Sequence, residues 1–247
     1  GTKGTLLWPM HKLLPTILLS LLACNDPVDI RRCNGAVELC ERPLNGVTFA
    51  AAHNAMSNHD EGWSAPNHWH GIKRQLNDGV RALLLDIYDD DGVPHLCHGV
   101  CWAGQEPLAE GLGKISEFME KNTDEVVLLV LQNTIAGEHL AEAFEHAGLR
   151  PLAIEHAAGT EWPTLAALID SGTRLLILTD HGDQAAPWLL PLTEQVRETH
   201  FQAESREDLS CALTRGSDSA QLILLNHFLT SPVAAPELAD QVNFNPY

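Results

Sequence analysis

The sequence is poor in cations, in cysteines and in long apolar runs. Lys and Arg number 15 against 33 Asp and Glu, so the 247-residue chain has a formal net charge of −18. This charge argues against a nucleic-acid-binding protein, because such binding depends on neutralising phosphates with cations. It also argues against electrostatic adhesion to anionic membranes, although a local pocket could still hold one anionic headgroup. With 45% apolar residues, the chain has enough material for a large core.

The apolar run nearest the N-terminus is too short to span a bilayer. Residues 13–24 form an apolar run of about a dozen residues after the short cationic segment 10–12, which is the pattern of an export signal. The run ends in Leu21-Leu22-Ala23-Cys24, which resembles the lipobox of bacterial lipoproteins, where the cysteine becomes the lipidated first residue. We therefore expect an exported protein anchored to the membrane at Cys24, with residues 1–9 preceding the natural start. A different export signal and a buried N-terminal helix are the alternatives.

The other cysteines fit an oxidising compartment. Cys33 lies close to Cys40 in the sequence, and Cys97 lies close to Cys101, so each pair is easily closed as a small disulfide loop. Metal ligation by these four residues is the weaker alternative, because no pair has the two-residue spacing of a zinc knuckle. Cys211 is left over, and we expect it to be free and buried.

Strand and helix patterns alternate along the rest of the chain. Residues 25–46 carry proline and Asn-Gly turn signals and are expected to form a tether and a leading loop. Apolar runs predict strands at 47–52, 80–87, 126–131, 174–178 and 221–225, and helical spacing predicts helices at 107–121, 138–147 and 164–169. This alternation predicts an α/β fold with a parallel sheet, as one domain over residues 47–247, and polar strand ends favour a barrel.

Polar residues end nearly every predicted strand. His53 and Asn54 follow the first strand, Asp86 ends the second, and His98 follows a short third run at 95–97. In α/β folds the carboxyl ends of the strands carry the chemistry, so these side chains are expected to share one rim. Two histidines beside an aspartate are the parts of a general acid–base device. The later strands end in Gln132, Asp180 and Asn226.

Five segments, in this order and at this spacing, resemble the phosphatidylinositol-specific phospholipase C X-domain superfamily: HNAMSN, GVRALLLDIYD, LCHG, VVLLVLQN and ILLNHF. The branch most similar to this chain is that of the exported phospholipase-C-like phosphodiesterases of plants, fungi and bacteria. The resemblance covers about residues 33–230. It implies a distorted TIM-type (β/α) barrel and cleavage of a phosphodiester by two histidines.

The resemblance also implies individual roles. His53 would take the proton from the attacking hydroxyl of the inositol ring, and His98 would protonate the departing glycerol oxygen. The products would be a cyclic inositol phosphate and diacylglycerol, and a near-neutral imidazole suits both roles. Asp86 matches a position that binds metal or orients charge, and Asn54 matches a calcium ligand of the animal enzymes. Asn226 matches the position where bacterial relatives carry an aspartate that orients the base, and it could accept a hydrogen bond from the imidazole.

The calcium site of the animal enzymes is incomplete in this chain. Leu84 and Gln132 stand where that site has two further carboxylates, so Asp86 is left as the one charged ligand for a hard cation. The metal-free bacterial enzymes have an arginine at the position of Asp86, and this chain lacks that replacement as well. A bound divalent cation such as Ca²⁺ and a site without metal are equally compatible with the sequence.

Three further residues are candidates for substrate binding: Gln132, Asp180 and Arg81. Arg81 lies earlier on the second strand, and a buried structural role is its alternative. Zinc held by histidines is a weaker interpretation; it would use His53, His59, His68 and His70. Three tryptophans of the rim loops would contact lipid, stack on a sugar ring or pack the loops: Trp63, Trp69 and Trp102.

The leading prediction is an exported, lipid-anchored, monomeric phosphoric diester hydrolase that acts on phosphatidylinositol or a related glycerophosphodiester. A glycerophosphodiester phosphodiesterase or a sphingomyelinase-D-like enzyme is disfavoured, because those families have a Glu-x-Asp pair where this chain has Leu84 and Asp86. A catalytically weak barrel that binds a headgroup or glycan is the alternative from another class, and the incomplete metal site supports it.

Overall fold

The computed structural model describes residues 1, 30–181, 185–231 and 233–243. The described residues from Arg31 onward belong to one compact unit, and the predicted signal and Cys24 lie outside the described residues. The strands are β1 Ala51–Ala52, β2 Ala82–Asp90, β3 Val93–Cys97, β4 Gln105–Pro107, β5 Val127–Asn133, β6 Leu175–Thr179, β7 Leu189–Pro191, β8 Val196–Thr199, β9 Leu213–Arg215 and β10 Leu222–Leu224. The helices are α1 Ile72–Asn77, α2 Leu108–Lys121, α3 Gly137–His146, α4 Leu165–Ser171, α5 Leu192–Gln195 and α6 Leu238–Asn243. None of the described helices has both the length and the apolar character needed to cross a bilayer.

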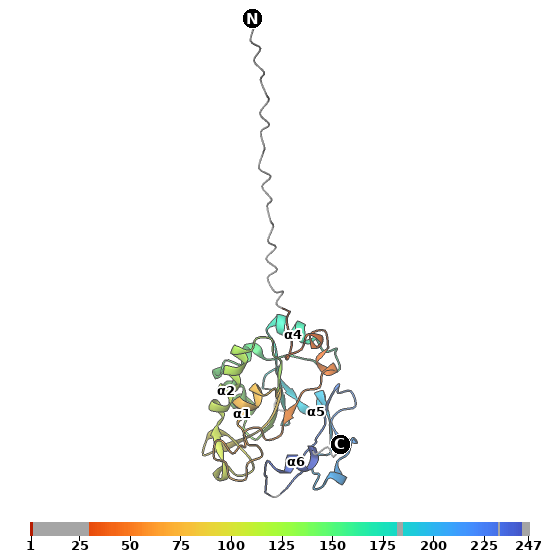
Figure 1. The fold of residues 1–247 in the computed structure, drawn as a ribbon. Helices are drawn as coiled ribbons and strands as arrows, with labels where there is room; N and C mark the ends of the chain where they lie inside the picture. The colour runs from red at the N-terminus through yellow and green to blue at the C-terminus, as the bar shows by residue number, and fades with distance from the viewer. Residues whose placement is uncertain (2–29, 182–184, 232, 244–247) are drawn as a thin grey trace. The chain divides into compact units, whose positions relative to one another are not determined.

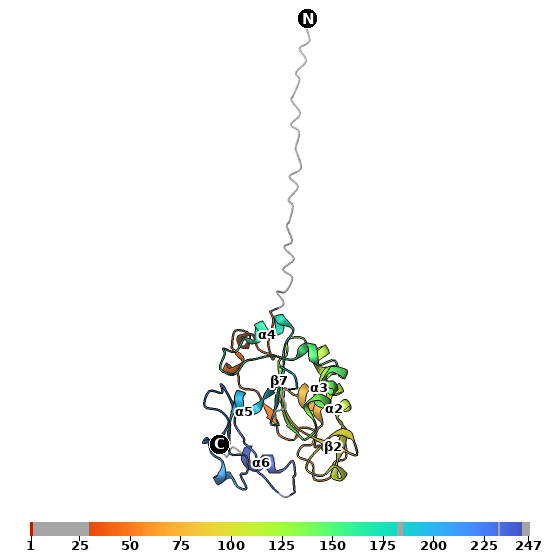
Figure 2. The same ribbon diagram turned by 180° about the vertical axis from the view of Figure 1, so that it is seen from behind.

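A parallel sheet forms the centre of the compact unit. Its strand order is β4-β3-β2-β5-β6-β7, and β1 pairs with β2. The pairs β1–β2, β2–β5, β5–β6 and β6–β7 are parallel, whereas β3 turns back antiparallel beside β2. In Figures 1 and 2, helices α2 and α3 lie on one flank of the unit, and α5 and α6 lie on the opposite flank.

The central strands are buried on both faces, as their continuous apolar runs predict. On β5, Leu129 and Leu131 pack into one core cluster together with α2 and α3, while Leu128 packs into a second cluster together with α4 and β8. The second cluster fills the inner side of the sheet. Alternate residues of each strand therefore face inward, and their polar successors at the carboxyl ends face the same side.

The expected barrel is open in the described residues. A second sheet has the order β10-β8-β9, and in the part of the chain that the structure describes no strand ladder joins it to the central sheet. The predicted strand 47–52 is regular only over Ala51–Ala52, because Val47 still closes the preceding 3₁₀ turn through a hydrogen bond to Leu44 O at 3.3 Å. This two-residue strand pairs with β2, and no second ladder of β1 closes the barrel in the described residues.

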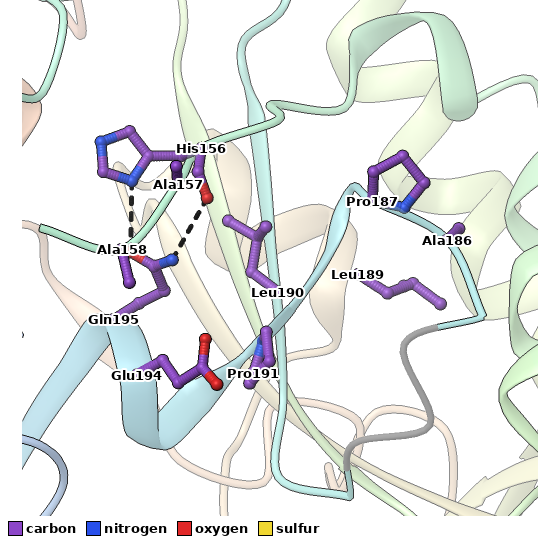
Figure 3. Close-up of a pocket in the computed structure, with 10 residues that line it drawn as sticks. All are labelled: His156, Ala157, Ala158, Ala186, Pro187, Leu189, Leu190, Pro191, Glu194 and Gln195. Carbon is purple, nitrogen blue, oxygen red and sulfur yellow. Dashed lines mark hydrogen bonds between the residues drawn. The ribbon is translucent and has the colours of Figure 1, made fainter. Parts of the chain in front are cut away.

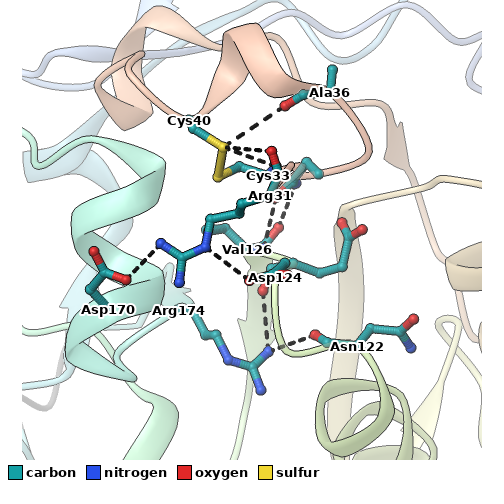
Figure 4. A network of polar contacts seen from close by, with 11 residues as sticks. Arg31, Cys33, Ala36, Cys40, Asn122, Asp124, Val126, Asp170 and Arg174 are labelled. Carbon is teal, nitrogen blue, oxygen red and sulfur yellow. Dashed lines mark hydrogen bonds and ion pairs between the residues drawn. A yellow bond between two sulfur atoms is a disulfide. The ribbon is translucent and has the colours of Figure 1, made fainter. Parts of the chain in front are cut away.

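The leading segment is bound to the N-terminal ends of the strands (Figure 4). Arg31 pairs with Asp124 at 3.3 Å and with Asp170 at 2.6 Å, and Arg174 donates to Asn122 O at 3.1 Å. The predicted disulfide Cys33–Cys40 closes this segment. These contacts hold residues 31–46 on the unit at the end of the sheet opposite the polar strand ends, so the predicted tether does not extend past residue 30.

The second predicted disulfide, Cys97–Cys101, is also present. Cys211 is exposed, contrary to the expectation of a buried thiol, and it pairs with no cysteine of the described part of the chain. It lies just before the short edge strand β9, where the chain has little around it to cover a side chain.

Candidate active site

His53 is placed by the first strand. Ala51 and Ala52 pair with the start of β2, and the Ala55 N–H donates to Leu84 O at 2.9 Å, so the histidine lies at the carboxyl end of this ladder. Asn54 follows with φ at 53°, a turn conformation that asparagine tolerates. Its side chain is buried.

The imidazole of His53 is enclosed. It stacks on the ring of Phe228 with centroids 3.9 Å apart and planes 9° apart. His68 donates from Nε2 to His53 O at 2.7 Å and so fixes the backbone at this point. Burial, and then the charges of His98 and His68, lower the pKa of His53 to about 4. The three histidines therefore form one cluster.

His98 lies in a loop closed by a disulfide. It directly follows Cys97 at the end of β3, and the Cys97–Cys101 bridge closes the turn after it. Gly99 has φ at 73°, and the Val100 N–H donates to His98 O at 2.8 Å. Burial lowers the pKa of His98 as well.

A row of polar side chains crosses the inner rim of the central sheet. Asp86 on β2 is in register with Gln132 on β5, and Asp180 follows β6 directly, with its N–H bonded to Leu131 O at 3.1 Å. Gln132 donates to the hydroxyl of Tyr88 at 3.2 Å. The structure therefore brings the sequence-predicted residues Asp86, Gln132 and Asp180 together.

The two carboxylates of this row differ in their partners. Asp180 accepts the Asn133 N–H at 3.0 Å and lies 2.9 Å from Nδ1 of His181. Asp86 is buried and has no hydrogen bond or ion pair with any described residue. Burial, and then the charge of Asp180, raise the pKa of Asp86 to about 7. Asp86 is thus a buried acid with no counter-ion from the described chain.

Asn226 anchors the loop after β10 to β8. Its side-chain amide donates to Glu198 Oε1 at 3.0 Å and to Thr199 O at 2.9 Å. Glu198 is itself buried and paired with Arg215. The expected hydrogen bond between Asn226 and the base histidine is not among the contacts of the described residues; Phe228, two residues later, touches His53 instead.

Arg81 is not part of this group. It precedes β2, at the N-terminal end of the sheet, and pairs with Glu125 at 2.7 Å. Its guanidinium also donates to Leu76 O at 2.6 Å and lies over the ring of Phe118. The interpretation of Arg81 as a substrate-binding residue is therefore wrong, and its structural alternative accounts for these contacts.

Sequence reasoning missed three residues of the site. Phe228 and Tyr88 carry no motif that marks a site, since aromatic residues near strand ends are common in cores. His68 was considered only as a zinc ligand, whereas here it donates to a backbone carbonyl, and no group of three or more His, Cys, Asp or Glu suited to a metal occurs in the described ranges. The pairing of His68 with residue 53 depends on the folding of a long loop, which no spacing encodes.

The rim tryptophans differ in exposure. Trp63 is buried against Gly104, where an added Cβ would lie 2.6 Å from the indole. Trp69 is 48% exposed and Trp102 is 86% exposed. Packing of the loops therefore explains the first tryptophan but not the other two.

A cavity of about 440 Å³ lies away from these residues, between the 156–158 segment, β7 and α5 (Figure 3). Two of its polar side chains pair with each other, because His156 Nδ1 lies 3.2 Å from Gln195 Oε1 and Gln195 donates back to His156 O at 3.3 Å. Neither His53 nor His98 lines this cavity, and we assign it no role.

Comparison with known proteins identifies the family. The model of the PI-PLC X family matches residues 39–246. An uncharacterized secreted protein of Arthroderma benhamiae is 29% identical over 77% of this chain and 45% of its own length. The PI-PLC X domain-containing protein At5g67130 of Arabidopsis thaliana is 28% identical over 77% of this chain and 50% of its own length. The chain thus spans about half the length of these two relatives.

A third relative and a solved structure extend this comparison. PI-PLC X domain-containing protein 1 of Arthroderma benhamiae is 28% identical over 98% of this chain and 82% of its own length. The phosphatidylinositol-specific phospholipase C of Listeria monocytogenes shares the fold, with a TM-score of 0.57 and 16% identity over 81% of this chain and 80% of that one. From the extent of the family match, the chain belongs to the PI-PLC X family.

Proposed function

We propose that this protein is a phospholipase-C-like phosphodiesterase that cleaves phosphatidylinositol or a related glycerophosphodiester. The carrying observation is the cluster of His53 and His98, two histidines from different strand ends whose pKa values are both lowered by burial. A base must be neutral to accept a proton, and the low pKa of His53 keeps it so. The family match supports the same reaction class.

In the proposed reaction, His53 takes the proton of the inositol hydroxyl as its oxygen forms a bond to phosphorus. The bond from phosphorus to the glycerol oxygen breaks, and His98 gives its proton to that oxygen. Diacylglycerol leaves, and the cyclic inositol phosphate remains. Gln132 and Asp180, in the polar row beside the cluster, are the proposed contacts for the hydroxyls of the headgroup.

A divalent cation is the cofactor that the family resemblance implies, and Asp86 fits one. The carboxylate is buried without a counter-ion from the described residues, and its pKa rises to about 7. A hard cation prefers such an oxygen and would return the carboxylate to its ionised form. Asp86 and Asn54 would hold the ion, and substrate or water oxygens would complete its shell. When bound, the ion would neutralise charge on the phosphate.

Export is proposed on two grounds. One relative is described as secreted, and both disulfides belong to an oxidising compartment. Lipid attachment at Cys24 and contact with a membrane surface extend this proposal, and mass spectrometry of the mature protein tests the attachment.

The reaction is tested by measuring the release of cyclic inositol phosphate by wild type, His53→Ala and His98→Ala, with and without a chelator. Loss of either group should reduce turnover by about 100-fold or more. A chelator should lower the rate if the ion at Asp86 takes part. No turnover by wild type, or turnover in both variants equal to that of wild type, would contradict the proposed reaction. A barrel that only binds the headgroup would instead bind inositol phosphate without releasing product.

A further inference from the structure

The side chain of His53 has an aromatic partner where a polar one was expected. No described residue forms a hydrogen bond or ion pair with its imidazole. The ring lies flat on Phe228, with 3.9 Å between centroids and 9° between planes. An acid–base histidine in this position must keep one ring orientation while the substrate enters.

The loop that carries Phe228 is anchored on both sides of it. Before it, Asn226 is held by Glu198 and Thr199, and His227 Nε2 lies 3.3 Å from Val242 O on α6. After it, the Thr230 N–H donates to Ala203 O at 2.7 Å, and its hydroxyl donates to Phe201 O at 2.9 Å. Phe228 is thus a half-buried ring at a fixed place in a braced loop.

The backbone of His53 is held independently. The ladder of β1 with β2 ends directly before it, and His68 donates to its carbonyl at 2.7 Å. With the backbone fixed on one side and the aromatic ring fixed on the other, the remaining freedom of the imidazole is rotation about its side-chain bonds. The stack stops a tilt out of the ring plane and leaves both ring nitrogens open at the edge.

We propose that Phe228 is a positioning residue that sets the plane of the His53 imidazole by stacking, in place of a hydrogen-bonded carboxylate. This inference rests on the proposed function for its effect on rate, but the stack itself does not. A flat ring is required, because an aliphatic side chain of similar volume covers the imidazole without fixing its plane.

Three substitutions separate the effect of fixing the plane of the imidazole from the effect of covering it with apolar atoms: Phe228→Tyr, Phe228→Leu and Phe228→Ala. The tyrosine keeps the ring, the leucine keeps apolar cover, and the alanine keeps neither. In histidine-labelled protein, the carbon-bound imidazole protons of His53, assigned by their loss in His53→Gln, should show an upfield ring-current shift in wild type and Phe228→Tyr. The shift should be absent in Phe228→Leu and Phe228→Ala.

Turnover should depend on the presence of an aromatic ring at position 228. Phe228→Tyr should keep most of the wild-type kcat, whereas Phe228→Ala should lose about 100-fold in kcat with little change in KM. Phe228→Leu should lose most of the wild-type kcat. It should keep the lowered pKa of His53, because apolar atoms still cover the imidazole. In Phe228→Ala the pKa should rise towards the ordinary value of 6.5.

Phe201→Leu is the matched control, because Phe201 also neighbours a histidine, His200, at 6.2 Å and a tilt of 30°. It should leave the His53 signals unchanged. Wild-type turnover by a folded Phe228→Leu, or a wild-type His53 signal without the ring-current shift, would overturn the inference. If wild type shows the shift but no turnover, the stack stands and the proposed reaction fails.

Discussion

At the scale of single residues, the two histidines of the cluster sit in apolar surroundings that disfavour their charged forms. Burial is the first cause of the lowered pKa of both His53 and His98. For a base this is an advantage at neutral pH. For an acid it is a cost, because His98 must carry a proton to give one to the leaving group. The two proposed roles therefore demand opposite protonation states from side chains with similar environments.

The pH profile of the free enzyme should reflect this conflict. We expect kcat/KM for a soluble phosphodiester to rise as pH increases through about 4, where His53 loses its proton. It should fall as pH increases through the pKa of His98, which lies below the ordinary 6.5. The maximum therefore lies on the acid side of neutrality, and a pH–rate profile measures it.

Stability must be followed over the same range. Because the folded pKa of His53 lies below its unfolded value, the unfolded chain binds more protons as pH falls from 6.5 towards about 4, and the free energy of unfolding declines. Rates are therefore corrected for the folded fraction. An optimum above neutrality in fully folded protein would mean that His98 is not the acid.

At the scale of elements, two small disulfide loops occupy opposite ends of the sheet. Cys97–Cys101 closes the loop of His98 at the rim, and Cys33–Cys40 closes the leading segment at the N-terminal ends of the strands. Each has one wholly buried cysteine. They are chemically alike and differ in what lies beside them, which makes them a natural pair for comparison.

Removing each bridge should separate stability from activity. The double changes Cys97→Ala with Cys101→Ser and Cys33→Ala with Cys40→Ser should each lower the free energy of unfolding by about 2 kcal/mol, as expected for short loops. Only the first should also lower kcat, by about 10-fold or more, because His98 loses its fixed position. Urea unfolding and turnover at a temperature where both variants are folded measure the two effects. Equal kcat in the two double variants would show that the rim bridge does not position His98.

At the scale of the whole molecule, the sequence predicted the strands and helices well and the closure of the barrel poorly. Continuous apolar runs mark β2, β5 and β6 because these strands are buried on both faces. Polar residues near the end of the parallel pairing placed Asp86, Gln132 and Asp180 on one rim, since carboxyl ends of parallel strands share an edge. Arg81 was assigned to the site because it is close to Asp86 in the sequence. The two residues point to different ends of the sheet, since Arg81 precedes β2 and Asp86 lies further along it.

The contacts that sequence reasoning missed join segments far apart in the chain. The stack of Phe228 on His53, and the hydrogen bond from His68 to the same residue, depend on how long loops fold over the rim. No periodicity records such contacts. The gap between the two sheets could not be predicted from periodicity either, since it depends on where short strands stop pairing.

The net charge of −18 should govern encounters with lipid surfaces. Raising NaCl from about 0.01 M to about 0.1 M shortens the Debye length from about 30 Å to about 10 Å. We expect this to increase cleavage of phosphatidylinositol in phosphatidylserine vesicles several-fold, because repulsion from the anionic surface is screened. Vesicles of phosphatidylcholine with the same phosphatidylinositol content should respond less. A rate that falls with salt on the anionic vesicles would instead indicate a basic docking surface.

The stack of His53 on Phe228 also has a consequence for the order of events during folding. The histidine comes from the first strand and the phenylalanine from the loop after the last one. Chains emerge N-terminus first, and contacts between distant segments form late because they must close a long loop. His53 therefore acquires its stacking partner only when the final strand has docked. A partly synthesised chain carries both histidines but not their stacking partner, so the proposed hydrolysis of lipid would begin only once the segment after β10 has docked.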